Sequence, residues 1–226
     1  MKQKTKENKD TKKVLVVDDH PIVCMGLSYL VNQEEDLVIC GEARNAHEAL
    51  EAIEALEPDV AIVDISLKGQ SGIELVKNIK IRYPKLPILV FSIHDEYVYS
   101  EIVLRAGAKG YVMKQEANEK IITAIHRVLD KEIYLSERIA SKILRKYFDK
   151  RSDKNGSPIE LLSDRELEIL RLIGQGYRNR QIAQELYLAI KTIETYRTHI
   201  RKKLKLKNSS ELVKYAIQWT LSEMVS

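Results

Sequence analysis

The chain has 226 residues but only two cysteines, Cys24 and Cys40, which form no CxxC pair and no Cys/His cluster with zinc spacing. This scarcity argues against a zinc site or a disulfide framework and predicts two buried thiols in a reducing compartment. No apolar run approaches the roughly 20 residues that span a bilayer. The charged N-terminal segment is not followed by the apolar stretch of a secretory signal. These absences predict a cytoplasmic protein with no membrane partner.

Charge is distributed unevenly along the chain. Residues 1–13 carry six lysines against two acidic groups, residues 14–158 carry 19 basic against 23 acidic groups, and residues 159–226 carry 12 basic against 8 acidic groups. We interpret residues 1–13 as a flexible basic tail, with a nucleic-acid-binding arm as the alternative. The change of sign between the two longer segments indicates two functions on one chain.

Short β-branched runs alternate with helical patterns through residues 14–130. The runs are VLVVDD, LVICGEA, DVAIVDI, PILVFSI and KGYVMK, and the helical patterns fall at about 21–33, 46–57, 72–82, 96–106 and 117–129. Continuously apolar runs indicate strands that are buried on both faces. Their alternation with helices predicts a doubly wound, five-stranded parallel sheet of the flavodoxin-like α/β class.

The rest of the chain is predicted to be helical. A polar linker is expected at 131–158, with a helix at about 136–149 and an end, KRSDKNGSP, that contains Gly and Pro. Ser163 and Glu166 have the spacing of a capping box that opens the next helix. Two short helices before a longer basic one predict an all-α helix-turn-helix domain at 159–226.

Polar side chains end four of the five predicted strands. They are Asp18 and Asp19 after the first, Asp64 after the third, Ser92 after the fourth and Lys114 after the fifth. Parallel strands place these ends at one edge of the sheet, where clustered carboxylates need a cation. Oxygen ligands favour Mg²⁺, and a carboxylate beside Mg²⁺ and an ammonium can form an aspartyl phosphate. Asp19 alone could be a helix cap before Pro21, but capping does not account for the whole combination.

The segments VVDDHP, AIVDISLKGQSGIEL, ILVFSIHDE and AGAKGYVMK make residues 14–130 similar to the receiver domain of bacterial two-component response regulators. The resemblance implies the following roles: Asp64 as phosphoacceptor; Asp18, Asp19, Asp64 and the backbone carbonyl of Ser66 as Mg²⁺ ligands; Ser92, Lys114 and Tyr111 as phosphoryl-binding and switch residues. Tyr111 would be half-buried at rest and would swing inward when Ser92 moves.

The same resemblance sets three finer expectations. Asp19 would be the direct metal ligand and Asp18 the water-mediated one. His20 is better explained as the residue that leads into the helix at Pro21 than as a catalytic group. Ser66 and His94, each two residues beyond a strand-end group, occupy positions where the family tunes the lifetime of the aspartyl phosphate.

Residues 162–219, beginning LSDRELEILRLIGQG, resemble the LuxR-type helix-turn-helix domain, and the pairing with a receiver is the NarL/FixJ arrangement. At about 100° per residue, Ile193, Ile200 and Leu204 share one face of the third helix and leave short polar and basic side chains opposite. Such a face suits the major groove, and the basic run that follows suits phosphates, although a solvated charged face is the alternative.

The candidate DNA-binding residues are Lys191, Thr192, Glu194, Thr195, Thr198, Arg201, Lys202 and Lys203. The resemblance places Glu194, Thr195 and Thr198 against base edges, while Lys191, Thr192, Arg201 and Lys203 would hold phosphates. Glu194 could accept from a cytosine amino group or orient a neighbouring arginine.

Leu212, Val213 and Ala216 lie in the last predicted helix. The resemblance implies that this helix supplies a homodimer contact, so that the dimer reads two half-sites. Packing within one chain is the alternative.

The sequence therefore predicts a DNA-binding transcriptional response regulator. A sensor histidine kinase would phosphorylate Asp64 with Mg²⁺, and this would control dimerisation and promoter binding. The chain would not be an enzyme beyond its own phosphoryl transfer and dephosphorylation. Two alternatives remain: a phosphatase with an aspartyl-phosphate intermediate, which usually has a second Asp at the position of Ser66, and a constitutive DNA-binding protein.

Overall fold

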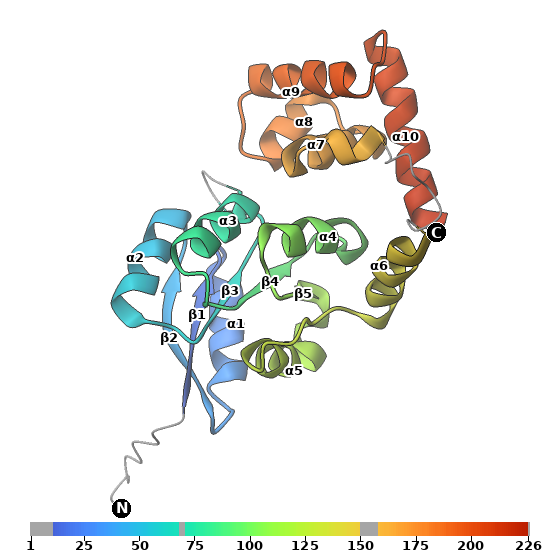
Figure 1. The fold of residues 1–226 in the computed structure, drawn as a ribbon. Helices are drawn as coiled ribbons and strands as arrows, with labels where there is room; N and C mark the ends of the chain where they lie inside the picture. The colour runs from blue at the N-terminus through green and yellow to red at the C-terminus, as the bar shows by residue number, and fades with distance from the viewer. Residues whose placement is uncertain (1–10, 68–70, 150–157, 226) are drawn as a thin grey trace, which may run out of the picture. The chain divides into compact units, whose positions relative to one another are not determined.

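The computed structural model describes residues 11–67, 71–149 and 158–225, and the chain divides into two compact units, residues 1–139 and 140–226. Most of the predicted basic tail and the end of the predicted linker lie outside the described residues. Figure 1 shows the elements of both units.

The first unit is a five-stranded parallel sheet in the order β2-β1-β3-β4-β5, which confirms the predicted fold class. The strands are β1 (Lys12–Val17), β2 (Leu37–Ala43), β3 (Val60–Val63), β4 (Ile88–Ser92) and β5 (Gly110–Met113). The helices are α1 (Pro21–Val31), α2 (Ala46–Leu56), α3 (Gly72–Arg82), α4 (Glu96–Ala106) and α5 (Ala117–Leu129), with a 3₁₀ turn η1 (Lys114–Glu116) after β5.

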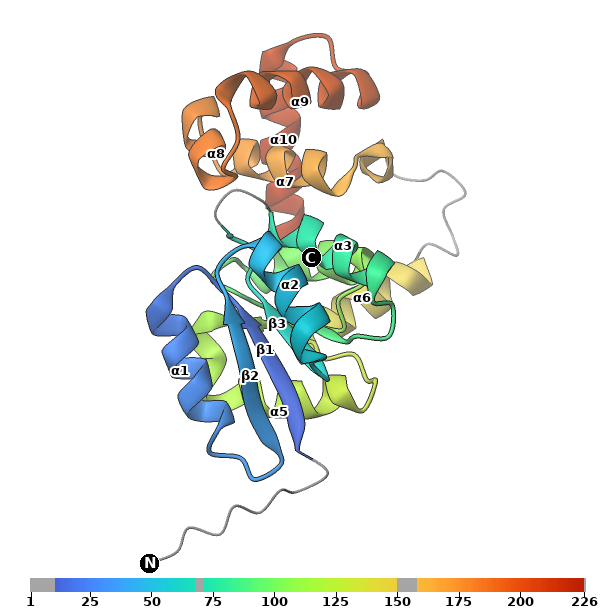
Figure 2. The ribbon, with the colours of Figure 1, turned by 90° about the vertical axis from the view of Figure 1, so that its left-hand side faces the viewer.

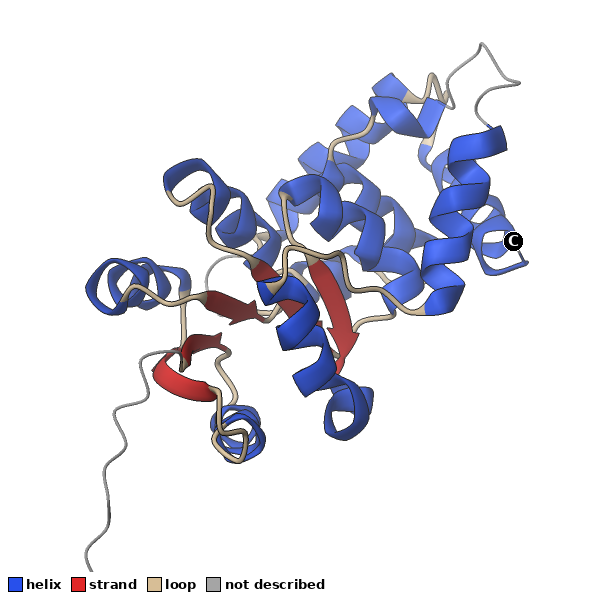
Figure 3. Ribbon diagram, turned by 60° about the horizontal axis from the view of Figure 1, so that its bottom comes forward, coloured by secondary structure: helices blue, strands red, loops and turns tan. Residues whose placement is uncertain are grey.

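Helices cover both faces of this sheet. Helices α1 and α5 pack on one face and α2, α3 and α4 on the other, so the strands lie between two helical layers (Figures 2 and 3). Strand β3 and the last four residues of β1 are buried throughout, which explains why their sequences are apolar without alternation. Because all five strands are parallel, the polar residues that follow them lie at one edge of the sheet.

The second unit is helical. Its elements are α6 (Glu137–Asp149), which begins at the boundary with the first unit, η2 (Pro158–Leu161), α7 (Asp164–Gly174), α8 (Asn179–Glu185), α9 (Ile190–Lys203) and α10 (Ser209–Val225). The predicted capping box is present: Ser163 accepts from the Glu166 amide, and the Glu166 carboxylate accepts from the Ser163 amide. Among the described residues, none of the helices combines the length and apolar character needed to cross a membrane.

Candidate functional sites

The ends of β1, β3 and β5 bring two carboxylates and one ammonium together. The Lys114 Nζ atom lies 2.6 Å from Asp18 Oδ2 and 2.8 Å from Asp64 Oδ2. Pairing of β1 with β3 sets this position, because the Asp64 amide donates to the Val17 carbonyl at 2.9 Å. Burial alone would lower the pKa of Lys114. The negative charges of Asp64 and Asp18 and the hydrogen bonds that Lys114 donates to them outweigh burial, so the pKa is raised.

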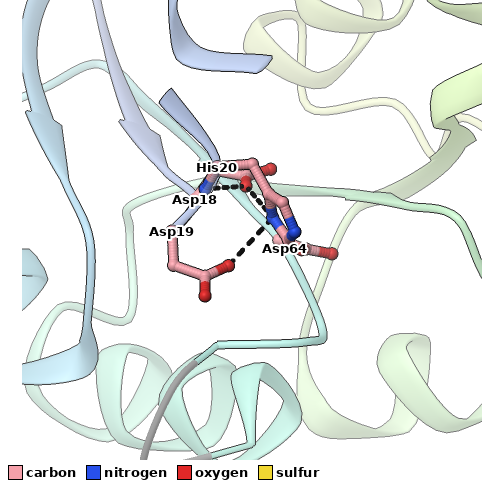
Figure 4. A group of neighbouring side chains, drawn as sticks. All are labelled: Asp18, Asp19, His20 and Asp64. Carbon is pink, nitrogen blue, oxygen red and sulfur yellow. Dashed lines mark hydrogen bonds and ion pairs between the residues drawn. The ribbon is translucent and has the colours of Figure 1, made fainter. Parts of the chain in front are cut away.

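One carboxylate oxygen of Asp64 is unpaired within the described residues. The residue is only 1% exposed; its Oδ2 accepts from Lys114, whereas its Oδ1 is buried and has no hydrogen-bond partner among the described residues. A buried carboxylate oxygen without a partner is costly. Ligand atoms of Asp18, Asp19, His20 and Asp64 lie within 4.8 Å of one another (Figure 4), so the donor set fits a divalent cation.

His20 contributes more to this cluster than the sequence predicted. It is the N-cap residue of α1, as expected, but its Nδ1 also lies 3.1 Å from Asp18 Oδ1 and 2.9 Å from Asp19 Oδ1 (Figure 4). Its backbone amide donates to Asp18 Oδ1 at 2.9 Å. The expectation that His20 leads into the helix at Pro21 is confirmed, and the contacts of its ring with Asp18 and Asp19 add to it. The sequence feature that indicates these contacts is the position of His20 directly after Asp18 and Asp19 at the end of β1. The division of ligand roles between Asp18 and Asp19 remains a prediction.

Ser92 and Tyr111 meet at the backbone of His94. The fully buried Ser92 hydroxyl accepts from the His94 amide at 3.3 Å, and the Tyr111 hydroxyl donates to the His94 carbonyl at 2.8 Å. Tyr111 is 1% exposed rather than half-buried, and this burial raises its pKa. The expected half-buried position is corrected: the ring is inside, where the His94 carbonyl satisfies its hydroxyl.

The side chains of Ser66 and His94 are joined directly. Ser66 Oγ lies 2.8 Å from His94 Nε2, and the His94 ring packs 4.8 Å from the Tyr99 ring, centroid to centroid. One hydrogen bond therefore connects the loop after β3 with the loop after β4. The role predicted for the Ser66 carbonyl remains a prediction.

Helix α9 has the predicted two-sided character. Ile193, Ile200 and Leu204 are buried in the core of the second unit. Of the candidate DNA-binding residues, Lys191, Glu194, Thr195, Lys202 and Lys203 are exposed, and Thr192, Thr198 and Arg201 are partly exposed. The N-cap residue, Ala189, makes no side-chain cap, which leaves first-turn N–H groups for an external acceptor such as a phosphate.

Lys203 makes an ion pair within its own unit. Its Nζ lies 2.6 Å from Oε2 of Glu166, which is 3% exposed and closes the capping box of α7. Burial raises the pKa of Glu166, but the Lys203 ammonium and the contacts with Ser163 overcome this and lower it. The ammonium of Lys203 is thus engaged by a buried carboxylate while its side chain is 41% exposed, and its role as a phosphate contact stays a prediction.

We expect Glu166→Gln to destabilise the second unit by about 1 kcal/mol at pH 7, because one partner of the ion pair is partly exposed. Because the pKa of Glu166 is lowered in the folded state, its charge contributes fully to stability above the ordinary glutamate pKa of about 4.3. The difference in unfolding free energy between Glu166→Gln and wild type should therefore shrink as the pH falls below about 4. Urea unfolding followed by Trp219 fluorescence measures this unit, because Trp219 is the single tryptophan. A difference in unfolding free energy that grows as the pH falls would contradict the ion pair between Glu166 and Lys203.

The predicted dimer residues divide between core and surface. Leu212 and Ala216 are 0% exposed and belong to the core of the second unit, so they cannot directly contact a second chain, and the prediction is corrected for both. Val213 is 36% exposed, and Ile217 and Leu221 are exposed along the same helix. Apolar residues occur on both faces of α10, so the sequence pattern could not tell the face that packs against α7 from the exposed one.

Comparisons with known proteins agree with this architecture. The response regulator receiver domain family matches residues 14–126, and the bacterial regulatory proteins of the luxR family match residues 160–216. The oxygen regulatory protein NreC of Staphylococcus haemolyticus is 37% identical over 91% of this chain and 97% of its own length. RcsB from Salmonella enterica serovar Typhimurium, solved bound to promoter rprA with the phosphomimetic BeF3⁻, is 29% identical over 91% of this chain and 98% of that chain, with a TM-score of 0.60. The response regulator ChrA of a heme-sensing two-component system is 27% identical over 94% of this chain and 99% of that chain, with a TM-score of 0.51.

Proposed function

Because the chain belongs to the LuxR-type, NarL/FixJ-family two-component response regulators, with a receiver domain and a DNA-binding domain, we propose that a sensor histidine kinase phosphorylates Asp64 and thereby controls dimerisation and promoter binding. The observation that carries the proposal is the environment of Asp64. It is buried, one oxygen is held by Lys114, and the other has no partner in the described part of the chain.

The residues around Asp64 have distinct roles in this proposal. Asp64 attacks the phosphorus, the bond from phosphorus to the kinase histidine breaks, and the charge of the new phosphoryl group is met by Lys114. A receiver implies a divalent metal site; we propose Mg²⁺, held by Asp18, Asp19, Asp64 and the Ser66 carbonyl. When bound, Mg²⁺ would neutralise the clustered carboxylates and the phosphoryl oxygens.

The response would spread through Ser92 and Tyr111. A phosphoryl group on Asp64 would accept a hydrogen bond from the Ser92 hydroxyl and draw Ser92 toward it, changing the position of the oxygen that now accepts from the His94 amide. His94 also binds the Tyr111 hydroxyl, so a shift of Ser92 biases the position of Tyr111 and the surface of α4 and β5. This is a population shift driven by the contacts of the phosphoryl group.

The output would be a dimer that reads two DNA half-sites. Val213 and Ile217 supply exposed apolar surface on α10 for the dimer contact. Lys191, Arg201 and Lys202 surround the short polar side chains of α9 and suit phosphate contacts. The chain would act on no separate substrate; Ser66 in place of a second aspartate disfavours a phosphatase.

The proposal is tested with Asp64→Asn and a matched control, Asp59→Asn, at the opposite end of β3. Asp59 pairs with Lys12 and the Lys13 amide, away from the cluster. With Mg²⁺ and beryllofluoride, wild type and Asp59→Asn should form dimers and bind an enriched DNA site about tenfold more tightly, a typical coupling between two sites. Asp64→Asn should show neither change. Sedimentation and fluorescence anisotropy measure both.

Two results would contradict the proposal. One is an equal response of Asp64→Asn and wild type. The other is a wild type whose dimerisation and DNA affinity are the same with and without beryllofluoride, which would support constitutive DNA binding.

A further inference from the structure

Building on the proposed promoter binding, we propose that α9 selects half-sites in which a cytosine amino group faces Glu194 and thymine methyl groups face Thr195 and Thr198. The inference concerns which base pairs are read. It rests on the hydrogen bonds that Thr195 and Thr198 make inside the protein and on the exposed carboxylate of Glu194.

The three side chains form the middle of one face of α9. At about 100° per residue, Glu194, Thr195 and Thr198 fall within a sector of roughly 100°, opposite the buried Ile193 and Ile200. Lys191 and Lys202 share this face but lie 11 residues apart, roughly 16 Å along the axis. The short side chains are therefore central, and the long cations lie toward the ends, where the groove gives way to phosphates.

Both threonines have already used their only hydrogen-bond donor. Thr195 Oγ1 donates to the Lys191 carbonyl at 3.0 Å, and Thr198 Oγ1 donates to the Glu194 carbonyl at 3.0 Å. A threonine hydroxyl has one hydrogen, so each now offers a DNA base only oxygen lone pairs and a methyl group.

Glu194 adds a third acceptor to this surface. Its carboxylate is exposed and has no hydrogen-bond or ion-pair partner within the ranges that the structure describes. Within those ranges the Glu194 carboxylate orients no arginine, which was the alternative open from the sequence. A carboxylate that enters the groove loses water and needs a donor in return.

The middle of the face thus lacks donors, and this restricts the bases that it can read. In the major groove guanine presents two acceptors, N7 and O6, which these side chains cannot satisfy as they are bonded. Cytosine presents the N4 amino donor, which a glutamate accepts, and thymine presents a methyl group, which a threonine methyl contacts. A C·G pair beside T·A pairs is the matching half-site.

The test is selection of binding sites from random double-stranded DNA with the full chain, Mg²⁺ and beryllofluoride. We expect an enriched half-site whose cytosine, when replaced, weakens binding by about tenfold, the scale of one good base contact. Glu194→Gln should shift the preference to adenine, which glutamine can bind in bidentate fashion. Glu211→Gln, whose side chain can still accept from the Lys207 amide, is the control and should leave the preference unchanged.

The thymine contacts are tested by replacing thymine with deoxyuridine, which lacks only the methyl group. Wild type should bind the uridine site about fourfold more weakly per contacted methyl group. Thr195→Ser or Thr198→Ser, which lacks the threonine methyl, should bind the uridine and thymine sites with nearly the same affinity. Uridine outside the half-site should have no effect. Specific enrichment that is indifferent to Glu194→Gln and to uridine would overturn the inference while leaving promoter binding intact. Failure to enrich any sequence would overturn both.

Discussion

Replacing Gly72 by alanine is expected to destabilise the receiver by about 3 kcal/mol and to slow phosphorylation of Asp64 by about 100-fold. A Cβ atom at Gly72 would lie 1.9 Å from the Asp64 carbonyl oxygen and 2.8 Å from the Asp64 carbonyl carbon and the Ile65 Cα. All three are backbone atoms, so no flexible side chain can move to make room. The segment that carries Asp64 must move instead, and misplacement of a reacting group by about 1 Å can cost this much in rate.

The chain provides a matched control at Gly26. This residue lies inside α1, and a Cβ there would meet no heavy atom within 4 Å. Gly26→Ala should stabilise the protein by about 0.5–1 kcal/mol, because glycine loses more conformational freedom in a helix. Urea unfolding by far-ultraviolet circular dichroism and labelling by acetyl phosphate measure the two effects. Equal behaviour of both variants would show that the close approach at Gly72 is not present in solution.

Replacing Lys114 by methionine is the second large effect. Lys114 contacts the buried carboxylates of Asp18 and Asp64, so its removal leaves two buried anions facing each other. Breaking a buried ion pair costs about 3–5 kcal/mol, and we expect about 3 kcal/mol in metal-free buffer. Because the pKa of Lys114 is raised, its contribution is complete at neutral pH and fades only as the pH rises through that pKa.

Lys120→Met is the control for this experiment. Its ammonium lies 2.7 Å from Glu116, but both side chains are more than one third exposed, so its loss should cost less than about 1 kcal/mol. Unfolding is measured with EDTA and with excess Mg²⁺. Added Mg²⁺ should stabilise Lys114→Met more than it stabilises wild type, because the cation replaces part of the lost charge. A Lys114→Met protein as stable as Lys120→Met would contradict the proposed electrostatics.

The architecture and the composition of the acidic site follow from the amino-acid pattern alone. Burial of β3, β4 and the last four residues of β1 makes these strands readable as short apolar runs. The periodicity of α9 identified Ile193, Ile200 and Leu204 as its core face. Parallel strands also place their carboxyl ends together, so Asp18, Asp64 and Lys114 could be predicted to meet before their distances were known.

The neighbours of several of these side chains depend on packing between distant segments and could not be predicted from the pattern. Glu166 lies 37 residues before Lys203, and no local pattern indicates that their side chains meet. Burial of Leu212 depends on the packing of α7 against α10, and the position of the His20 ring depends on how the turn after β1 is folded. Periodicity states which face of an element is apolar, but the partner that covers it is set by packing between segments distant in sequence.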